Sequence, residues 1–465
     1  MARPLRDSAD DLQAALGILE PCAPYAEALA QSSRGLGVRI DKAETEVLPT
    51  PPMRGVMLRA WTRAGWREVG LAGVEREQLI AAAGELAEQL PEAPTQGPPG
   101  EPASGTGDFA TAERRPIDDL SVEDRLAEAR RRHGVAMSVP GVQNAFAALF
   151  GYREERLFVS TTGCVRSQSL ARVTTSIVSI ALDGGRSETD FDVAGGTGGF
   201  ELLEQLSDEQ IRGVSTGALS QLKAKEPPAG KVSVLLDPSG TGTFAHESFG
   251  HGTEADQFLR NRSYLKDRLG QQLAPSSLTL VDDGTLAGGY GSSFFDDEGF
   301  ATSRTVIIDQ GRFAEVLHDR ESAASMGRRP TGNARRADFL SRSFVRMTNT
   351  GVLPGEQSVE ELLATARNGV LLERCTSGVE DPLGGQMQIK FKKGRRIENG
   401  QLTDVLPSMA LSGNVLEFLR SIRGISRGPS DTSGDPGMCG KGVTDLLPVG
   451  DFGTYLLGEA VVGRA

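Results

Sequence analysis

The sequence predicts an α+β chain of two domains, and three observations lead to this prediction. Segments with strand patterns and segments with helical spacing alternate before residue 227, whereas the chain beyond 277 is mostly strands and turns. The 57 glycines favour turns and strand ends over long helical bundles. A Pro-Pro-Ala-Gly stretch at 227–230 is the best candidate boundary. We therefore expect an N-terminal α+β domain at 1–228 and a strand-rich C-terminal domain at 229–465 that carries a metal-binding helix.

Helical and strand patterns alternate through the N-terminal domain. Leucines with helical spacing predict a helix within 8–33, with Ser8 as its N-cap. Residues 91–116, rich in Pro and Gly, are expected to form a flexible linker or surface excursion. Ser121 and Asp124 form a predicted capping box at the start of a helix that runs to about Arg132. The other elements follow from their patterns: strands within 37–73, a helix over 74–90, strands at 157–159 and 173–180, and a helix over 208–225.

The C-terminal domain opens with a buried-type strand at 231–236, which leads through a glycine turn into a helix. Further helices are expected near 358–373 and 414–421. An acidic turn at 296–299 is interpreted as a hairpin turn rather than a cation site. A basic run that includes Arg335, Arg336, Arg342 and Arg346 is interpreted as a solvated face, with substrate or partner binding as the alternative.

Composition excludes several functional classes. With 50 basic and 62 acidic residues the chain carries −12, which argues against nucleic acid as a partner. The four cysteines form no C-x-x-C pair, which favours a reducing compartment over a disulfide framework. We find no signal peptide and no run of 18 apolar residues, so a cytoplasmic protein without a membrane partner is expected.

The helix that follows strand 231–236 carries the most informative motif. Residues 246–251 read H-E-x-x-x-H, one residue longer than the H-E-x-x-H of zinc peptidases, and they hold two of the four histidines. His246 and His251 can bind a metal, and Glu247 can act as general base toward water. In a regular helix residues five apart are about 140° out of phase. We therefore predict a local π-helical distortion, which Gly250 would permit.

A catalytic zinc site usually has a third protein ligand. The candidates are His133, His318, acidic residues and the four cysteines, and Cys439 stands out because it lies in a glycine-rich turn at 437–442. On local sequence alone, a surface thiol is an equal alternative for Cys439. Glu254 and Asp256 follow His251 and are either carboxylate partners of a ligand imidazole or, more commonly, an exposed acidic turn.

A second motif overlaps the same segment. Residues 240–245 read G-x-G-x-x-A between a strand and a helix, which is the context of a dinucleotide-binding turn. No strand ending in an acid follows about 20 residues later, so this interpretation is the weaker one.

Five motifs follow one another in a fixed order. They are His246–His251 with Gly252 and Glu254, Phe295-Asp-Asp-Glu-Gly299, Arg346–Thr350 before Leu353-Pro354-Gly355, Gly384-Gly385-Gln386 and Gly437-Met-Cys-Gly-Lys441. In this order they resemble the TldD/PmbA family of metallopeptidases, in its metal-bearing TldD type. The resemblance is strong after residue 230 and weak before 117. It implies a two-domain α+β chain with Zn²⁺ held by His246, His251 and Cys439, and with Glu247 as base.

The resemblance also implies a dimer with a PmbA (TldE)-type chain that lacks the metal motif, and cleavage of unfolded or short peptides. Two departures are expected to alter the substrate groove: the insert at 91–116, and Met387–Lys390 in place of an N-P-x-T-G-D-F-like continuation. We therefore predict a zinc peptidase acting on unfolded, short or modified peptides. The alternatives are a metalloenzyme that tailors a natural product or peptide precursor, and a non-catalytic partner subunit with a structural metal.

Overall fold

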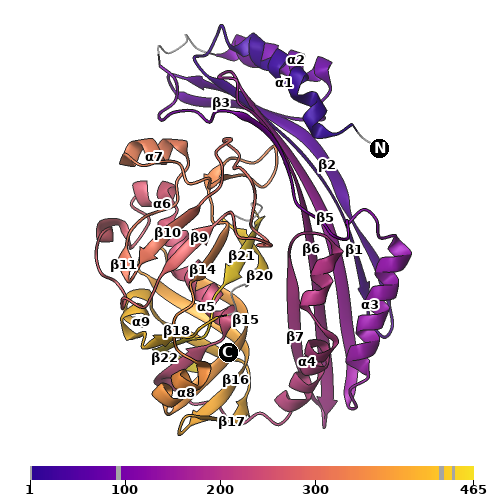
Figure 1. Ribbon diagram of the computed structural model, residues 1–465, viewed down its shortest axis with the longest axis vertical. Helices are drawn as coiled ribbons and strands as arrows, with labels where there is room; N and C mark the ends of the chain where they lie inside the picture. The colour runs from indigo at the N-terminus through magenta and orange to yellow at the C-terminus, as the bar shows by residue number, and fades with distance from the viewer. Residues whose placement is uncertain (1–2, 91–95, 429–433, 442–445) are drawn as a thin grey trace.

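The computed structural model describes residues 3–90, 96–428, 434–441 and 446–465. The strands before residue 200 form one long twisted sheet, and the strands after 229 form separate sheets that pack against it (Figure 1). This arrangement confirms the α+β class, with a strand-rich C-terminal part. The division into domains at residue 228 stays a prediction. In the described ranges, no helix is both long and apolar enough to cross a membrane.

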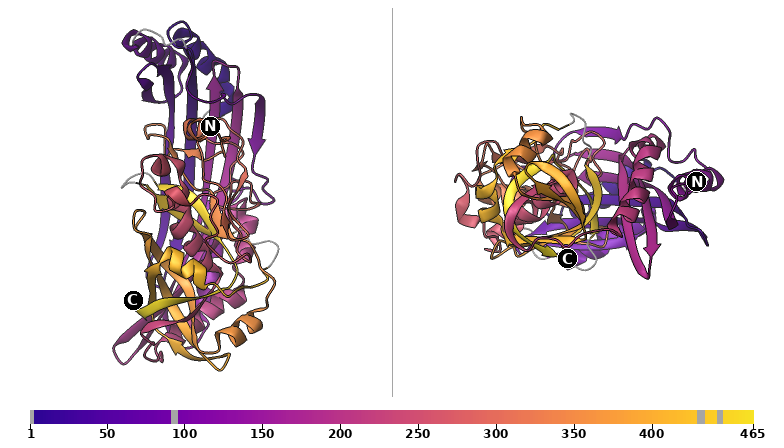
Figure 2. Two further views of the ribbon diagram at one scale, coloured as in Figure 1. Left: turned by 90° about the vertical axis from the view of Figure 1, so that its left-hand side faces the viewer. Right: turned by 90° about the horizontal axis from the view of Figure 1, so that it is seen from below.

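The N-terminal sheet has the strand order β3-β2-β1-β5-β6-β4, and β7 also pairs with β6. Its strands are β1 (Ala26–Ile40), β2 (Thr45–Thr62), β3 (Gly65–Ala72), β4 (Thr106–Ala110), β5 (Val142–Ser160), β6 (Val165–Asp183) and β7 (Arg186–Thr197). Four helices accompany it: α1 (Ala9–Leu19), α2 (Arg76–Gln89), α3 (Val122–Met137) and α4 (Asp208–Gln221). Helices α1 and α2 pack together at one end of the sheet, while α3 and α4 lie beside its other half (Figures 1 and 2).

The C-terminal part contains a six-stranded sheet and a second sheet that closes on itself. The first has the order β11-β10-β9-β14-β21-β20; the second has the order β15-β8-β22-β18-β16-β17, and pairing of β15 with β16 closes the ring that Figure 2 shows from below. The strands are β8 (Gly230–Leu236), β9 (Leu280–Asp283), β10 (Arg304–Asp309), β11 (Arg312–Phe313), β14 (Asn349–Val352), β15 (Gly369–Glu380), β16 (Gln386–Glu398), β17 (Gln401–Leu406), β18 (Met409–Asn414), β20 (Asp435–Gly440), β21 (Leu446–Phe452) and β22 (Leu456–Arg464). Two shorter pairings complete the set, β12 (Ala334–Arg335) with β13 (Phe344–Val345), and β19 (Gly424–Ile425) with β22.

Helix α5 (Pro238–Ala245) lies between these two sheets and positions the candidate site. It contacts β15 and β16 of the closed sheet and β14 and β21 of the other. Phe244 is fully buried, and its ring lies 4.7 Å from that of Phe418 on α9 (Val415–Ser421). The H-E-x-x-x-H segment, which continues from α5, therefore begins inside the largest hydrophobic core of the chain. Burial of this kind fixes the backbone from which the functional side chains extend.

Strand pairing overrides local sequence in parts of two N-terminal predictions. The helix predicted within 8–33 ends at Leu19, because residues 26–40 form β1 between β2 and β5. Ser8 precedes α1, but its side chain makes no capping hydrogen bond. Within the insert at 91–116, residues 91–95 lie outside the described residues, and Thr106–Ala110 is not a flexible linker because it pairs in parallel with β6.

The predicted capping box at Ser121 and Asp124 is confirmed, and α3 runs beyond the predicted end to Met137. The helix predicted over 358–373 is α8 (Val359–Ala366), which ends early because β15 begins at Gly369 and pairs with β8. Two short helices were not predicted: α6 (Ala255–Leu259) and α7 (Arg320–Met326). Neither is long enough to show a clear helical period.

Buried ion pairs join the C-terminal part to the N-terminal sheet. Residues 295–301 form the predicted turn, since the Asp296 N–H donates to Phe300 O at 2.8 Å. Its acids are nevertheless buried: Asp297 pairs with Arg156, and Glu298 lies 2.9 Å from Arg59. These acids neutralise arginines at the interface, which is the condition under which charge is tolerated in a protein interior.

The predicted solvated basic face is wrong for three of its four arginines. Arg335, Arg336 and Arg346 are almost fully buried, whereas Arg342 lines a surface pocket. Arg335 donates to backbone carbonyls, including Pro448 O at 2.8 Å. Arg346 donates to Cys439 O at 2.6 Å and so links the basic run to the strand that carries the cysteine.

Candidate metal centre

A π-helical turn accommodates the five-residue spacing of the two histidines. Asp237 caps α5 by accepting a hydrogen bond from the Gly240 N–H at 2.8 Å. The helix then widens into a π turn over His246–Gly250, and His251 begins a 3-10 turn that ends at Thr253. The two imidazole centroids lie 5.2 Å apart. The predicted π distortion is confirmed, and such distortions are frequent at functional sites.

The glycines at 240, 242 and 250 allow neighbouring residues to pack closely against the helix. Gly250 has an ordinary helical φ of −54°, but a Cβ there would overlap the side chain of Met347. Gly240 and Gly242 lie inside α5, where a Cβ would meet the Phe391 ring and the backbone of residues 451–452. Because these two glycines face packed protein within the helix, the segment does not provide the open turn that a dinucleotide pyrophosphate requires.

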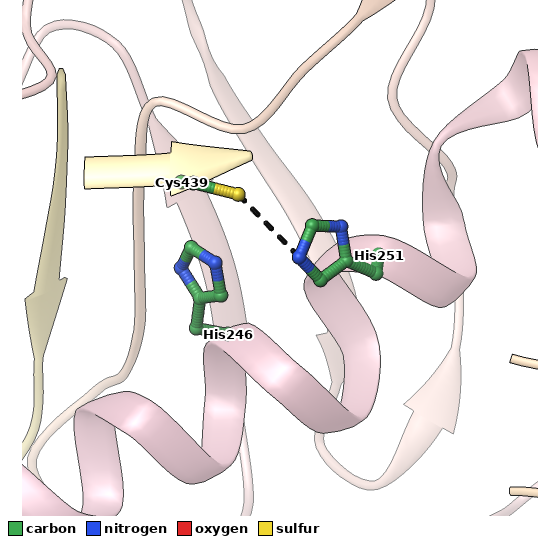
Figure 3. A group of neighbouring side chains, drawn as sticks. All are labelled: His246, His251 and Cys439. Carbon is green, nitrogen blue, oxygen red and sulfur yellow. Dashed lines mark hydrogen bonds between the residues drawn. The ribbon is translucent and has the colours of Figure 1, made fainter. Parts of the chain in front are cut away.

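Three side chains converge above the π turn. His246, His251 and Cys439 place one potential ligand atom each within 4.8 Å of one another. The sulfur comes from β20, 188 residues after His251, and lies 3.4 Å from His251 Nε2 (Figure 3). Among the described residues, this is the one group of three or more His, Cys, Asp or Glu with such geometry. His133 and His318, the other candidate histidines, do not belong to it.

Each imidazole is held by a carboxylate on its other nitrogen. His246 Nδ1 lies 2.8 Å from Asp451 Oδ1, and His251 Nδ1 lies 3.5 Å from Glu254 Oε2. This leaves the Nε2 atoms free to face the sulfur. Carboxylates in this position orient metal-binding imidazoles and raise their basicity. Asp451 was not predicted, because it lies on β21 and no local pattern connects it to His246.

Of the two alternatives for Glu254 and Asp256, the exposed acidic turn is wrong, because a lysine with a buried side chain pairs with both, and Glu254 is the carboxylate partner of an imidazole. Lys441 Nζ lies 2.9 Å from Glu254 and 2.7 Å from Asp256. Burial opposes ionisation of Glu254, but Lys441, His251 and Arg346 outweigh it and lower its pKa to about 2. Glu254 is therefore charged at neutral pH and can hold the His251 ring.

The electrostatics of the cluster favour a thiolate. Burial raises the pKa of Cys439, but the adjacent His246 and His251 rings outweigh burial and lower that pKa to about 5. Against the effect of burial, Cys439 and Glu254 raise the pKa of His251 to about 10. The thiolate is the form of cysteine that binds metals.

Glu247 extends from the π turn into a cleft beside the cluster. Burial raises its pKa, which brings the carboxylate closer to the range of a general base. Its side chain lies against Gly378 of β15, where a Cβ would overlap it. The cleft has a volume of about 620 Å³ and continues past His246 and Glu247 into a recess of about 260 Å³ beside β7. The lining of the main cleft includes His246, Glu247, His251, Glu380 and Cys439.

The fold and site define a class of protein: a two-part α+β chain with a largely buried His-His-Cys cluster and a carboxylate at the edge of a cleft. A family model, the PmbA/TldA metallopeptidase C-terminal domain, matches residues 229–445. A metalloprotease of Methanothermobacter thermautotrophicus is 35% identical over 353 residues, covering 75% of this chain and 76% of that protein. A metalloprotease TldD homolog of Haemophilus influenzae is 29% identical over 340 residues, covering 72% and 68%.

A zinc metalloprotease TldD homolog of Saccharolobus solfataricus is 34% identical over 245 residues, covering 52% of each chain. Solved structures share the whole fold. A protein of Thermotoga maritima described as a putative modulator of a DNA gyrase has a TM-score of 0.79 at 19% identity, covering 98% of this chain and 99% of that one. TldE of Thermococcus kodakarensis has a TM-score of 0.73 at 16% identity, covering 97% and 100%. The chain belongs to the PmbA/TldD family, as the sequence motifs predicted.

Proposed function

We propose that this chain is a zinc-dependent peptidase that hydrolyses unfolded, short or modified peptides. The observation that carries this proposal is the convergence of His246, His251 and Cys439, with their ligand atoms within 4.8 Å of one another, beside the Glu247 carboxylate. The names of the relatives, which include metalloproteases and a zinc metalloprotease, support the same activity.

The donor set fits zinc. Two imidazoles and one thiolate are the soft and intermediate ligands that zinc prefers, whereas magnesium and calcium prefer oxygen. Three protein ligands are the usual number at a catalytic zinc, which keeps a further position for water or substrate. The cleft of about 620 Å³ borders all three side chains and gives substrate a route to that position. When bound, the ion supplies a Lewis acid that polarises the peptide carbonyl and acidifies water.

The protein side chains have separate tasks in the proposed hydrolysis. A carboxylate oxygen of Glu247 accepts the proton of the attacking water and returns it to the leaving amine, so that no covalent intermediate forms. Asp451 and Glu254 hold the two imidazole rings through their Nδ1 atoms. Gly378 leaves the space that the Glu247 side chain occupies.

The edges of two strands suit an extended peptide. Beyond Leu372, β15 keeps only β16 as a strand partner, and β20 pairs only with β21, within the described residues. Both strands border the cleft and its recess. An extended peptide binds such an edge through main-chain hydrogen bonds, which favours unfolded substrates.

The partner proposal is a dimer with a PmbA/TldE-type chain. The similarity of this fold to TldE of Thermococcus kodakarensis supports it. A cytoplasmic location stays a prediction from the sequence.

Removal of zinc provides the test of the proposed activity. Chelation is expected to abolish cleavage of an internally quenched, unstructured peptide, and one equivalent of zinc per chain is expected to restore it. Magnesium is the matched control and should not restore cleavage, because the donor set lacks oxygens. Failure of zinc-loaded protein to cleave any of a panel of unstructured peptides would instead favour the non-catalytic partner subunit.

Asp451→Asn is expected to weaken zinc binding by about 10- to 100-fold, because the amide cannot supply the charge that orients His246. Competition with a chromogenic zinc chelator measures this change. The control is Asp309→Asn, which removes an exposed carboxylate at the end of β10. Equal zinc affinity in the two variants would contradict the role given to Asp451.

A further inference from the structure

One wall of the cleft is the hairpin that joins β15 to β16. Gly378, Val379 and Glu380 of this hairpin line the cleft together with Leu383. Gly378 lies against Glu247. Because side chains two residues apart point to the same face of a strand, Glu380 extends to the side on which Glu247 lies.

The hairpin is fixed over the π turn. The Asp381 N–H donates to Gln386 O at 2.8 Å and closes the hairpin. The Tyr264 N–H donates to Pro382 O at 2.9 Å, and the Tyr264 hydroxyl donates to Ser248 O within the π turn. Glu380 is therefore held in place by the same segment that presents the candidate ligands, as a specificity residue must be.

The Glu380 carboxylate forms no ion pair within the part of the chain that the structure describes. Both carboxylate oxygens are buried, and neither has a hydrogen-bond partner among the described residues. Lys441, in the same cleft, is engaged by Glu254 and Asp256. Arg262, also on the lining, is exposed and forms no ion pair with Glu380 in the part of the chain that the structure describes. A buried carboxylate without a donor is costly, and burial raises the pKa of Glu380 to about 8.

We propose that Glu380 binds a protonated amine of the peptide substrate, so that the cleft selects peptides presenting a free α-ammonium group or a lysine side chain beside the scissile bond. This inference rests on the proposed peptidase function. Two residues of a strand span about 6.6 Å, so Glu380 lies about two peptide residues along β15 from Gly378, against which Glu247 packs. Val379, Leu383 and Met438 beside it are exposed and apolar, so the negative charge on the hairpin wall of the cleft comes from Glu380.

The test measures binding, so it does not depend on turnover. Zinc-loaded Glu247→Gln protein is titrated calorimetrically with three peptides of one length and otherwise one sequence. The first has a free N-terminus and no lysine, the second is N-acetylated without lysine, and the third is N-acetylated with one lysine. At least one amine-bearing peptide is expected to bind about 10- to 100-fold more tightly than the second, as a charge-assisted hydrogen bond in a partly buried site predicts.

Adding Glu380→Gln to this protein should remove the preference while leaving the affinity for the second peptide within about twofold. Glu417→Gln, which removes an exposed carboxylate on α9 outside the cleft, should retain it. The first and third peptides distinguish an α-ammonium from a lysine as the bound group. Equal binding of all three peptides, no binding of any, or a preference that survives Glu380→Gln would overturn the proposal. A preference for amines in a wild-type protein that cleaves nothing would refute the peptidase function alone.

Discussion

Glu247→Gln is expected to keep its zinc and to lose peptide hydrolysis by about 10²- to 10⁴-fold in kcat. The amide has nearly the same shape as the carboxylate, so its position against Gly378 can persist. It cannot accept a proton from water, and the general base is lost. Steady-state cleavage of an internally quenched peptide measures kcat, and mass spectrometry of the same sample measures zinc.

The control for this change is Glu417→Gln, which removes an exposed carboxylate from α9 and should leave both quantities unaltered. Turnover of zinc-loaded Glu247→Gln within a few-fold of the wild type would remove Glu247 from the mechanism. Loss of zinc together with activity would show instead that Glu247 supports the metal.

Cys439→Ser is expected to weaken zinc binding more strongly than Asp451→Asn does. Loss of a carboxylate partner such as Asp451 lowers metal affinity by about 10- to 100-fold. The neighbouring imidazoles lower the pKa of the thiol to about 5 against the effect of burial, so the sulfur is ionised at neutral pH. A serine hydroxyl stays protonated there and is a poorer zinc ligand. Equilibrium dialysis against a zinc buffer measures the change.

Cys375→Ser is the matched control, because Cys375 lines the adjoining recess but does not belong to the cluster. Burial raises the pKa of Cys375 to about 12, so this thiol is not ionised at neutral pH. Equal zinc affinity of the two serine variants would contradict the ligand role of Cys439.

The parts of the site that the sequence predicted are those with a local signal. His246, Glu247 and His251 lie within six residues, and their spacing alone required the π turn that the structure contains. Cys439 had a weaker signal, its glycine-rich surroundings, and the family resemblance was needed to favour it. Its sulfur reaches His251 only because β20 pairs with β21 beside α5.

The parts that the sequence did not predict depend on long-range pairing. Asp451 meets His246 across 205 residues, and Glu380 enters the cleft because β15 lies against the π turn. The same cause explains the errors in the fold. Residues 26–33 have helical spacing in isolation, yet they form the middle of a sheet once β2 and β5 lie on either side.

We propose above that His246, His251 and Cys439 together hold one zinc ion. X-ray absorption at the zinc edge of the purified, zinc-loaded chain tests it most directly, because it counts the donor atoms by type. We expect one sulfur at about 2.3 Å and two imidazole nitrogens at about 2.0 Å, with the remaining position taken by an atom lighter than sulfur. A shell without sulfur, or one with four protein donors and no open position, would contradict it.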